Sequence, residues 1–138
     1  MARPRFANLD LDTRYRILET AAEQFAARGF EGVSLNQLID RLGMSKGSFY
    51  YYFDDKGDLF TTVADLAWAI VLPVEQLDLE ALHTDNYWSS LEALMQEARS
   101  RVRANPWLVG FTRLMYDPPD IAGVRESLAE KFDRARQW

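Results

Sequence analysis

The stretch that decides the fold of this chain runs from residue 29 to residue 60 and reads GFEGVSLNQLIDRLGMSKGSFYYYFDDKGDLF. It contains two short segments with apolar residues at helical spacing, separated by the turn Gly43-Met44-Ser45. Two helices joined by about three residues with a glycine in the turn are typical of the helix-turn-helix motif. The stretch therefore predicts a helix-turn-helix whose second helix is Lys46–Phe53.

Capping residues mark where the helices of this stretch begin and end. Ser34 is expected to cap the first helix of the pair, with Gln37 three residues later completing a capping box. Gly43 is expected to end that helix, because glycine readily adopts the left-handed backbone of a helix terminus. Ser45 is expected to cap the second helix, and Asp55 a longer one that follows.

Apolar residues recur at helical spacing along nearly the whole chain, and no stretch alternates convincingly at period two. Before the quoted stretch, Asp12 or Thr13 is expected to cap a helix that ends at Gly29. After it, prolines and acidic loops separate three further helices, the last of which is Ile121–Trp138. The predicted fold class is all-α.

Composition narrows the class of protein. The 138 residues are 48% hydrophobic, 13% aromatic and 27% charged, which is the profile of a soluble globular protein. The absence of cysteine excludes disulfides and thiolate metal sites. The longest uncharged apolar run, Leu66–Val74, is shorter than the roughly 20 residues that cross a bilayer, and the N-terminus lacks a signal-peptide pattern. We therefore expect a cytoplasmic protein with no cofactor, no metal and no membrane partner.

The net charge of −5 runs against the basic surface that phosphate binding favours. The acidity is unevenly distributed, however. Residues 1–60 hold eight basic and nine acidic side chains, whereas residues 61–138 hold eight and twelve. The net charge therefore argues against non-specific nucleic-acid binding, but it is compatible with a small DNA-binding surface.

The tyrosine triplet Tyr50, Tyr51 and Tyr52 is the main functional signal. Successive residues of a helix point about 100° apart, so three consecutive tyrosines cannot share one buried face. Phe49 and Phe53, four residues apart, suffice to anchor the helix, which leaves at least one or two tyrosines exposed. A DNA groove would give them partners, since phenols donate to phosphates and their rings pack on sugars and thymine methyls. The alternative is structural, with one tyrosine covering the core and two having no function.

The same stretch resembles the DNA-binding domain of the TetR family of bacterial regulators. The matching features are the Ala-Ala-x-x-Phe core of the preceding helix, the Gly29-Phe30 corner and the run Ser45–Phe53 followed by Lys56 and Leu59. The resemblance covers about the first sixty residues. It implies that DNA is contacted by Ser34, Lys46, Gly47, Ser48, Tyr50, Tyr51, Tyr52 and Lys56.

The resemblance also has departures. The family often has histidine at the position of Tyr52, which still offers a hydrogen bond, and serine at the position of Asp55. Asp54 and Asp55 add negative charge close to the expected phosphates, which opposes the contribution of Lys56.

What the resemblance implies for the whole chain is a three-helix helix-turn-helix DNA-binding domain in residues 1–54, followed by a helical ligand-binding or regulatory domain in residues 55–138. The implied function is that of a transcriptional repressor, a homodimer on a palindromic double-stranded operator, released by a small-molecule effector. The family's dimer interface is normally made by two further helices. We therefore expect the regulatory domain to be incomplete at the C-terminus and to lack the helices of that interface.

Aromatic and methionine side chains in the second region are candidates for an effector pocket. The candidates are Trp68, Tyr87, Trp88, Met95, Trp107, Phe111 and Met115. Aromatic stripes at helical spacing are also normal in hydrophobic cores, so ordinary packing is the alternative.

Two other readings concern the N-terminus and the class of protein. Arg3 and Arg5 would form either a minor-groove arm or a disordered basic tail, and we expect the tail. With one histidine, no cysteine, no glycine-rich phosphate loop and no nucleophile elbow, we do not expect an enzyme. A helical protein–protein interaction module without DNA specificity is the alternative function.

Overall fold

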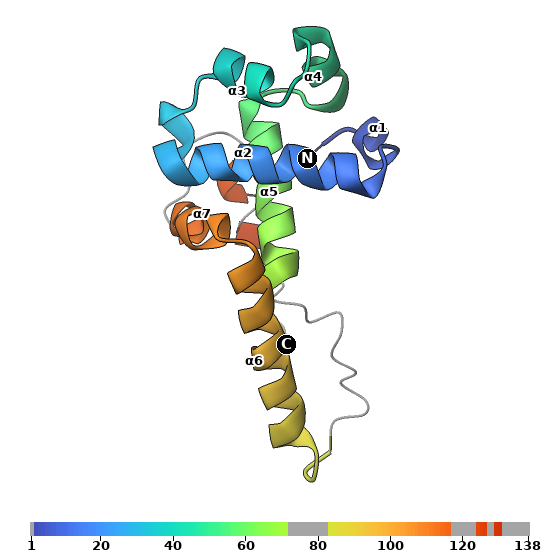
Figure 1. The fold of residues 1–138 in the computed structure, drawn as a ribbon, viewed down its shortest axis with the longest axis vertical. Helices are drawn as coiled ribbons and strands as arrows, with labels where there is room; N and C mark the ends of the chain where they lie inside the picture. Colours follow the sequence, from blue (N-terminus) through green and yellow to red (C-terminus); the bar gives the residue numbers. More distant parts are fainter. Residues whose placement is uncertain (1, 72–82, 117–123, 127–128, 131–138) are drawn as a thin grey trace.

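The computed structural model describes residues 2–71, 83–116, 124–126 and 129–130, and all regular structure in these ranges is helical (Figure 1). The all-α prediction is confirmed. The predicted last helix, Ile121–Trp138, and one of the predicted acidic loops, Asp78–Asp85, lie mostly outside the described residues. The helices are α1 (Pro4–Ala7), α2 (Leu11–Gly32), α3 (Leu35–Arg41), α4 (Lys46–Tyr52), α5 (Lys56–Val71), α6 (Tyr87–Ala104) and α7 (Trp107–Tyr116).

The long helix α2 begins earlier than predicted. The carboxylate of Asp10 accepts a hydrogen bond from the backbone N–H of Thr13 at 2.8 Å, so Asp10 is the cap and the predicted caps, Asp12 or Thr13, are wrong. This bond also lowers the pKa of Asp10 below its usual value, because it stabilises the ionised carboxylate. Near the other end, Gly29 takes φ of 70° and kinks the chain, so the regular part of α2 ends where predicted.

The turn between α3 and α4 has the predicted glycine and cap. Gly43 has φ of 67°, and the N–H of Met44 donates to the carbonyl of Ile39 at 3.2 Å, the bond pattern of a Schellman motif. The Oγ of Ser45 then accepts from the N–H of Ser48 at 3.0 Å and starts α4. These local bonds fix the helix-turn-helix.

The predicted capping box at the start of α3 is wrong. Ser34 occupies the cap position, but its side chain makes no capping hydrogen bond. The Oε1 of Gln37 instead accepts from the guanidinium of Arg28 at 3.3 Å. The side chain of Gln37 is thereby drawn toward α2.

One hydrophobic core joins the helix-turn-helix to the helices that follow it. The ring of Phe60, on α5, lies 5.2 Å from that of Phe25 on α2 and 5.1 Å from that of Phe111 on α7, measured between centroids. All three rings are fully buried. The core therefore spans the predicted domain boundary at residues 54 and 55, and the first turns of α5 belong to the body of the helix-turn-helix.

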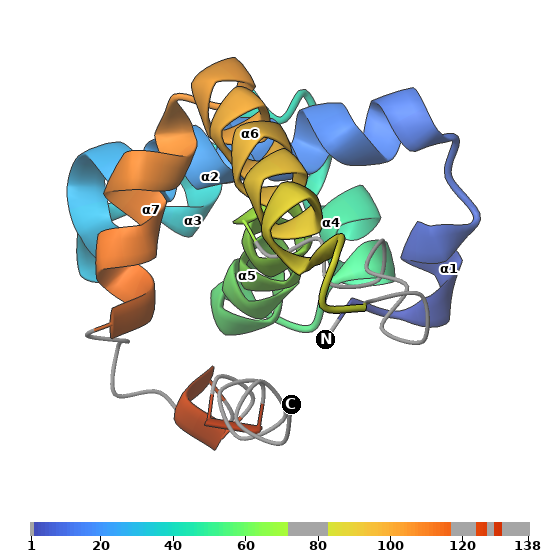
Figure 2. The ribbon, with the colours of Figure 1, turned by 90° about the horizontal axis from the view of Figure 1, so that it is seen from below.

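Helix α6 packs against α5 along part of its length and projects beyond the body (Figure 1). α2 and α7 pack together, whereas α6 projects from them (Figures 1 and 2). None of the residues of α6 is buried. A hydrogen bond from the hydroxyl of Tyr15 on α2 to the side chain of Asn105 ties the end of α6 to the body.

Candidate nucleic-acid interface

Two phenylalanines hold α4 to the body of the molecule. Phe49 and Phe53 have no exposed surface, and their ring centroids lie 5.4 Å apart. A helix of seven residues has little stability of its own, so this packing is what keeps it formed. The predicted anchoring of α4 by these two rings is confirmed.

The opposite side of α4 faces outward. Tyr50 and Tyr51 keep 47% and 48% of their surface exposed. Tyr52 is half-buried, with its ring 6.0 Å from that of Phe6 in an edge-on contact. The expectation that at least one or two of the tyrosines are exposed is confirmed, and Tyr52 is the one turned toward the protein.

The first turn of α4 is also open. Lys46, Gly47 and Ser48 are all exposed. A Cβ built on Gly47 would meet only the Oγ of Ser45, at an ordinary contact distance of 3.8 Å. The fold therefore has no steric need for glycine at position 47, and the empty space lies on the outer surface.

Two serines flank this surface with different surroundings. Ser34, at the start of α3, is exposed and its hydroxyl makes no capping bond. The Oγ of Ser48 lies 2.9 Å from that of Ser45, so it is engaged in the cap of α4. Ser34 offers the freer hydroxyl of the two.

Lys56 lies at the start of α5 and serves inside the fold. Its Nζ donates to the carbonyls of Phe30 at 2.8 Å and Val33 at 3.0 Å, and it sits 4.2 Å from the centre of the Phe30 ring. The ammonium thus binds carbonyls at the end of α2, where a cation is favoured. Two of the three N–H donors of Lys56 are used there, so only the third remains for the predicted DNA contact.

The N-terminal arm, which we define as residues 2–8, is folded against α4. The backbone N–H of Arg3 donates to the carbonyl of Tyr52 at 2.9 Å, and Phe6 is buried with its ring 4.9 Å from that of Phe53. The expected disordered basic tail is wrong. The overlooked signal is Phe6, a large apolar residue two positions after Pro4, which starts a helix.

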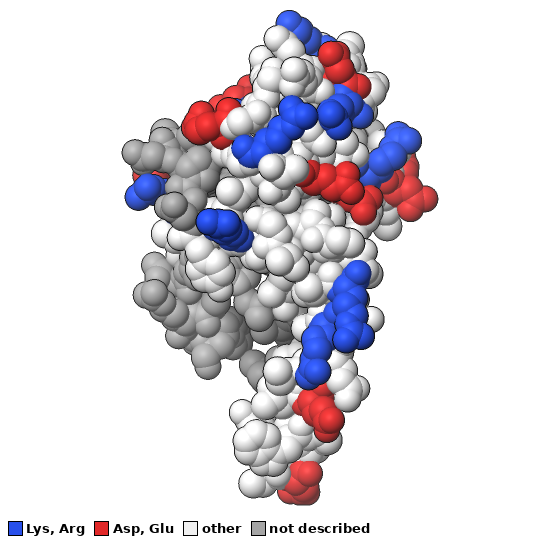
Figure 3. Space-filling model, turned by 60° about the vertical axis from the view of Figure 1, so that its left-hand side comes forward, with Lys and Arg blue, Asp and Glu red and all other residues white. Residues whose placement is uncertain are grey.

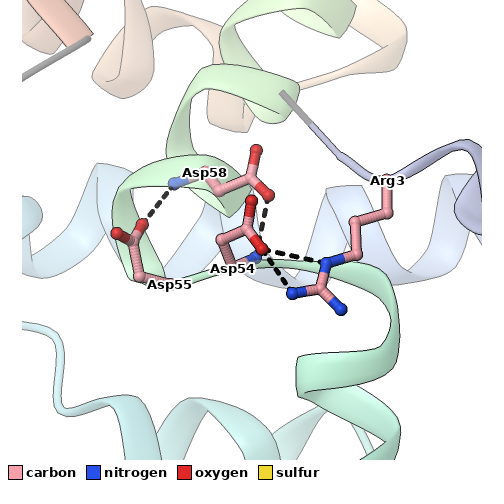
Figure 4. Close-up of polar contacts among 4 residues, drawn as sticks. All are labelled: Arg3, Asp54, Asp55 and Asp58. Carbon is pink, nitrogen blue, oxygen red and sulfur yellow. Dashed lines mark hydrogen bonds and ion pairs between the residues drawn. The ribbon is translucent and has the colours of Figure 1, made fainter.

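The carboxylates that follow α4 are occupied by partners within the protein (Figure 4). Asp55 accepts from the N–H of Asp58 at 2.8 Å, which confirms it as the cap of α5. Asp58 accepts in turn from the N–H of Asp54 at 2.9 Å. Asp54 binds the guanidinium of Arg3 at 2.5 and 2.9 Å. The acidic residues near the candidate interface therefore start a helix and bind the arm.

The face of the molecule drawn in Figure 3 is mixed in charge. Figure 3 shows basic and acidic side chains close together over the part of the molecule that carries α2 to α4, and a row of basic side chains along α6. On this face there is no broad basic field. Contacts with a polyanion would depend on a few placed groups.

The structure does not bring the predicted effector residues together. Trp68 and Met115 line an apolar cavity of about 50 Å³ between α5 and α7. Trp107 and Phe111 are core residues, while Tyr87, Trp88 and Met95 are exposed on α6. Ligand sites usually measure about 300–1,000 Å³, so this cavity is too small for a drug-sized molecule. The effector set as predicted is scattered over three environments.

Among the parts of the chain that the structure describes, no helix combines the length and the apolarity needed to cross a membrane.

Comparison with known proteins points to one family. Residues 17–67 match the family model described as bacterial regulatory proteins, tetR family. The chain is 31% identical over 117 residues to the HTH-type transcriptional repressor DrrR1 of Streptomyces coeruleorubidus, which covers 82% of this chain and 41% of that protein. It is 37% identical over 62 residues to the repressor AcnR of Corynebacterium diphtheriae, covering 44% of this chain and 33% of the relative.

A solved structure agrees in fold. A TetR family transcriptional regulator from Chloroflexus aurantiacus superposes with a TM-score of 0.64 at 26% identity, over 93% of this chain and 58% of the other. The chain thus spans less than half the length of the two repressors and little more than half of the solved structure.

Proposed function

The chain belongs to the TetR family of bacterial regulatory proteins through its N-terminal domain, and on this premise we propose that it is a sequence-specific, DNA-binding transcriptional regulator. The observation that carries the proposal is the division of α4 into two sides. Phe49 and Phe53 are fully buried, whereas Tyr50, Tyr51 and Lys46 are exposed on a helix that a glycine turn places after α3. This is the arrangement in which a helix-turn-helix presents its second helix to the major groove.

Within that groove we assign the contacts according to side-chain chemistry. Tyr50 and Tyr51 read base edges and sugars, and Lys46 binds a phosphate. Ser34 donates to a second phosphate from the start of α3. Tyr52 and Lys56 stabilise the DNA-binding surface from within the protein, since Tyr52 packs on Phe6 and Lys56 binds backbone carbonyls.

The regulator acts as a two-fold dimer on a palindromic operator. Two copies of α4 must then lie about 34–36 Å apart, one turn of DNA, to enter successive major grooves. We assign it the role of a repressor, which is also the role named for DrrR1 and AcnR. A small-molecule effector releases it by binding one spacing of the two helices better than the other.

We assign the effector site to the region between α5 and α7, where Trp68 and Met115 line the small cavity. Because the cavity there is small, the effector-bound state must separate these helices. An effector bound there would then change the fluorescence of Trp68, which lines the cavity.

The experiment that tests the function is selection of duplexes from a random pool by the unaltered chain, followed by binding isotherms on the selected sequence. Tyr51→Ala and Lys46→Ala are expected to weaken binding about tenfold or more while the helical circular dichroism stays unchanged. Tyr87→Ala is the matched control, since Tyr87 on α6 is as exposed as Tyr50. Isotherms of both α4 variants that coincide with the control would remove α4 as the reading helix.

A second candidate function has its own supporting observation. Trp88 keeps 75% of its surface exposed on α6, where Tyr87 and Met95 are exposed as well. Exposed apolar side chains that gather in a patch mark contact surfaces. A protein–protein interaction module without DNA specificity would use this face. It predicts that no duplex sequence is enriched by the selection, and that Trp88→Ala removes partner binding.

A further inference from the structure

We propose that the N-terminal arm, residues 2–8, is part of the DNA-reading surface. Arg5 binds the DNA phosphate backbone beside Tyr51, and Arg3 positions α4 and screens Asp54 from the DNA. The inference rests on the proposed function, since it takes α4 as the reading helix. It adds two arginines that neither the family match nor the helix-turn-helix pattern assigns, because the match begins at residue 17.

The arm is attached to α4 through backbone and side chain. The last turn of a helix leaves carbonyls without partners, and the N–H of Arg3 satisfies that of Tyr52 at 2.9 Å. Phe6 then closes the arm onto the same helix, with its ring 6.0 Å from Tyr52 and 4.9 Å from Phe53. The position of the arm therefore follows the position of α4.

Arg5 is presented on the exposed side of this junction. The carbon at the centre of its guanidinium lies 4.6 Å from the centroid of the Tyr51 ring. Both residues are exposed, and Arg5 has no ion pair within the ranges that the structure describes. A guanidinium that lies over an aromatic ring keeps its N–H groups free at the edge, where they match the geometry of phosphate oxygens. The ring of Tyr51 therefore holds a cation ready for the backbone of the strand that Tyr51 reaches.

Arg3 acts differently. Its guanidinium is bound to Asp54 at 2.5 Å, and the two side chains are 43% and 63% exposed (Figure 4). A pair this exposed contributes little to stability. The Arg3–Asp54 pair has a larger effect on DNA affinity, because Asp54 follows α4 by two positions and an unscreened carboxylate there would repel phosphate. Arg3 is thus a positioning and screening residue, while Arg5 is a contact.

The test of the contact is the salt dependence of binding to the duplex selected by the unaltered chain. Arg5→Ala is expected to weaken binding about tenfold, and by the same factor for the selected duplex as for any other sequence. It should also reduce the slope of log K against log salt by about 1, as expected for the loss of one phosphate contact. Arg99→Ala, which removes an exposed arginine from α6, is the control and should leave the slope unchanged. An Arg5→Ala slope equal to that of Arg99→Ala would overturn the contact.

The test of the screening role is a cycle between Arg3 and Asp54. Arg3→Ala should weaken binding several-fold, and adding Asp54→Asn should restore most of the loss, because the repelling carboxylate is gone. A double variant as weak as Arg3→Ala alone would overturn the screening role. Thermal unfolding of all variants should be nearly unchanged, as expected of an exposed pair.

The two levels of the proposal fail separately. If the unaltered chain selects no duplex, the proposed function is lost, and the inference with it. If it selects a duplex through Tyr51 and Lys46 while Arg5→Ala matches the Arg99→Ala control, only the inference is lost.

Discussion

Ala26 on α2 and Gly110 on α7 lie so close that a Cβ on Gly110 would come within 3.0 Å of the Cβ of Ala26 and 3.4 Å of its carbonyl oxygen. The two helices therefore approach each other through the absence of a side chain. This contact joins α2, which packs against α3, to α7, which follows α5 and α6 along the chain. Together with α5 and the Tyr15–Asn105 hydrogen bond, this surface connects the helix-turn-helix to α6 and α7.

Gly110→Ala should destabilise the protein. The added methyl is rigidly attached and meets backbone-linked atoms, so α2 and α7 must separate, at a cost of about 1–3 kcal/mol that better helix propensity only partly offsets. The midpoint of urea unfolding measures the loss. A variant as stable as the parent would show that the helices are not closely packed at this point.

Gly47→Ala should have the opposite pattern. Since a Cβ at position 47 meets only ordinary contacts, stability should stay the same or rise by up to about 1 kcal/mol from helix propensity. DNA affinity should fall several-fold, because the methyl occupies the surface that approaches the groove. Unfolding curves and binding isotherms of one preparation measure both, and undiminished affinity would place Gly47 away from the DNA.

Variants of Lys46 and Lys56 should separate effects on stability from effects on DNA binding. Lys56→Met removes the bonds to the carbonyls of Phe30 and Val33 and should cost about 1–3 kcal/mol of unfolding free energy. Lys46→Met, at an exposed site, should change stability by less than about 0.5 kcal/mol and act on DNA affinity. Equal stability of the two variants would contradict the role given to Lys56.

Tyr15→Phe should loosen the junction between α2 and the end of α6. Asn105 is buried, its Nδ2 donates to the carbonyl of Arg101 at 2.8 Å, and its Oδ1 would lose the Tyr15 hydroxyl. We expect the free energy of unfolding at pH 7 to fall by about 1 kcal/mol. This is near the lower end of the cost of leaving a buried acceptor unsatisfied, because Tyr15 itself is partly exposed. Chemical unfolding of variant and parent measures it.

The surroundings of Tyr15 also set a pH dependence. Burial, with the charge of Glu19 adding to it, raises the pKa of Tyr15 above its usual value of 10.0. The unfolded chain then loses the proton first, so the stabilisation is complete below about pH 10 and is lost as pH rises through the folded-state pKa. The stability difference between parent and Tyr15→Phe should shrink above pH 10. A difference that stays constant through pH 11 would rule out this origin.

What the sequence by itself determined are the features set by neighbours along the chain. The turn at Gly43, the cap at Ser45 and the cap at Asp55 depend on residues within five positions, and each was predicted from its local pattern. The exposure of Tyr50 and Tyr51 follows from helix geometry alone, since two phenylalanines already occupy the inner side of α4. The missed cap at Asp10 was also local, because three nearby residues were all able to cap.

Only the tertiary structure decided which long-range partners these residues take. Lys56 binds carbonyls up to 26 positions away, and Arg3 binds Asp54 across 51 positions, so no local pattern distinguishes either from a residue free to bind DNA. Periodicity likewise marks Trp88 and Phe111 as apolar alike, although one is exposed on α6 and the other is fully buried. The physical reason is that a helical repeat defines a face, while burial depends on whether another helix arrives to cover it.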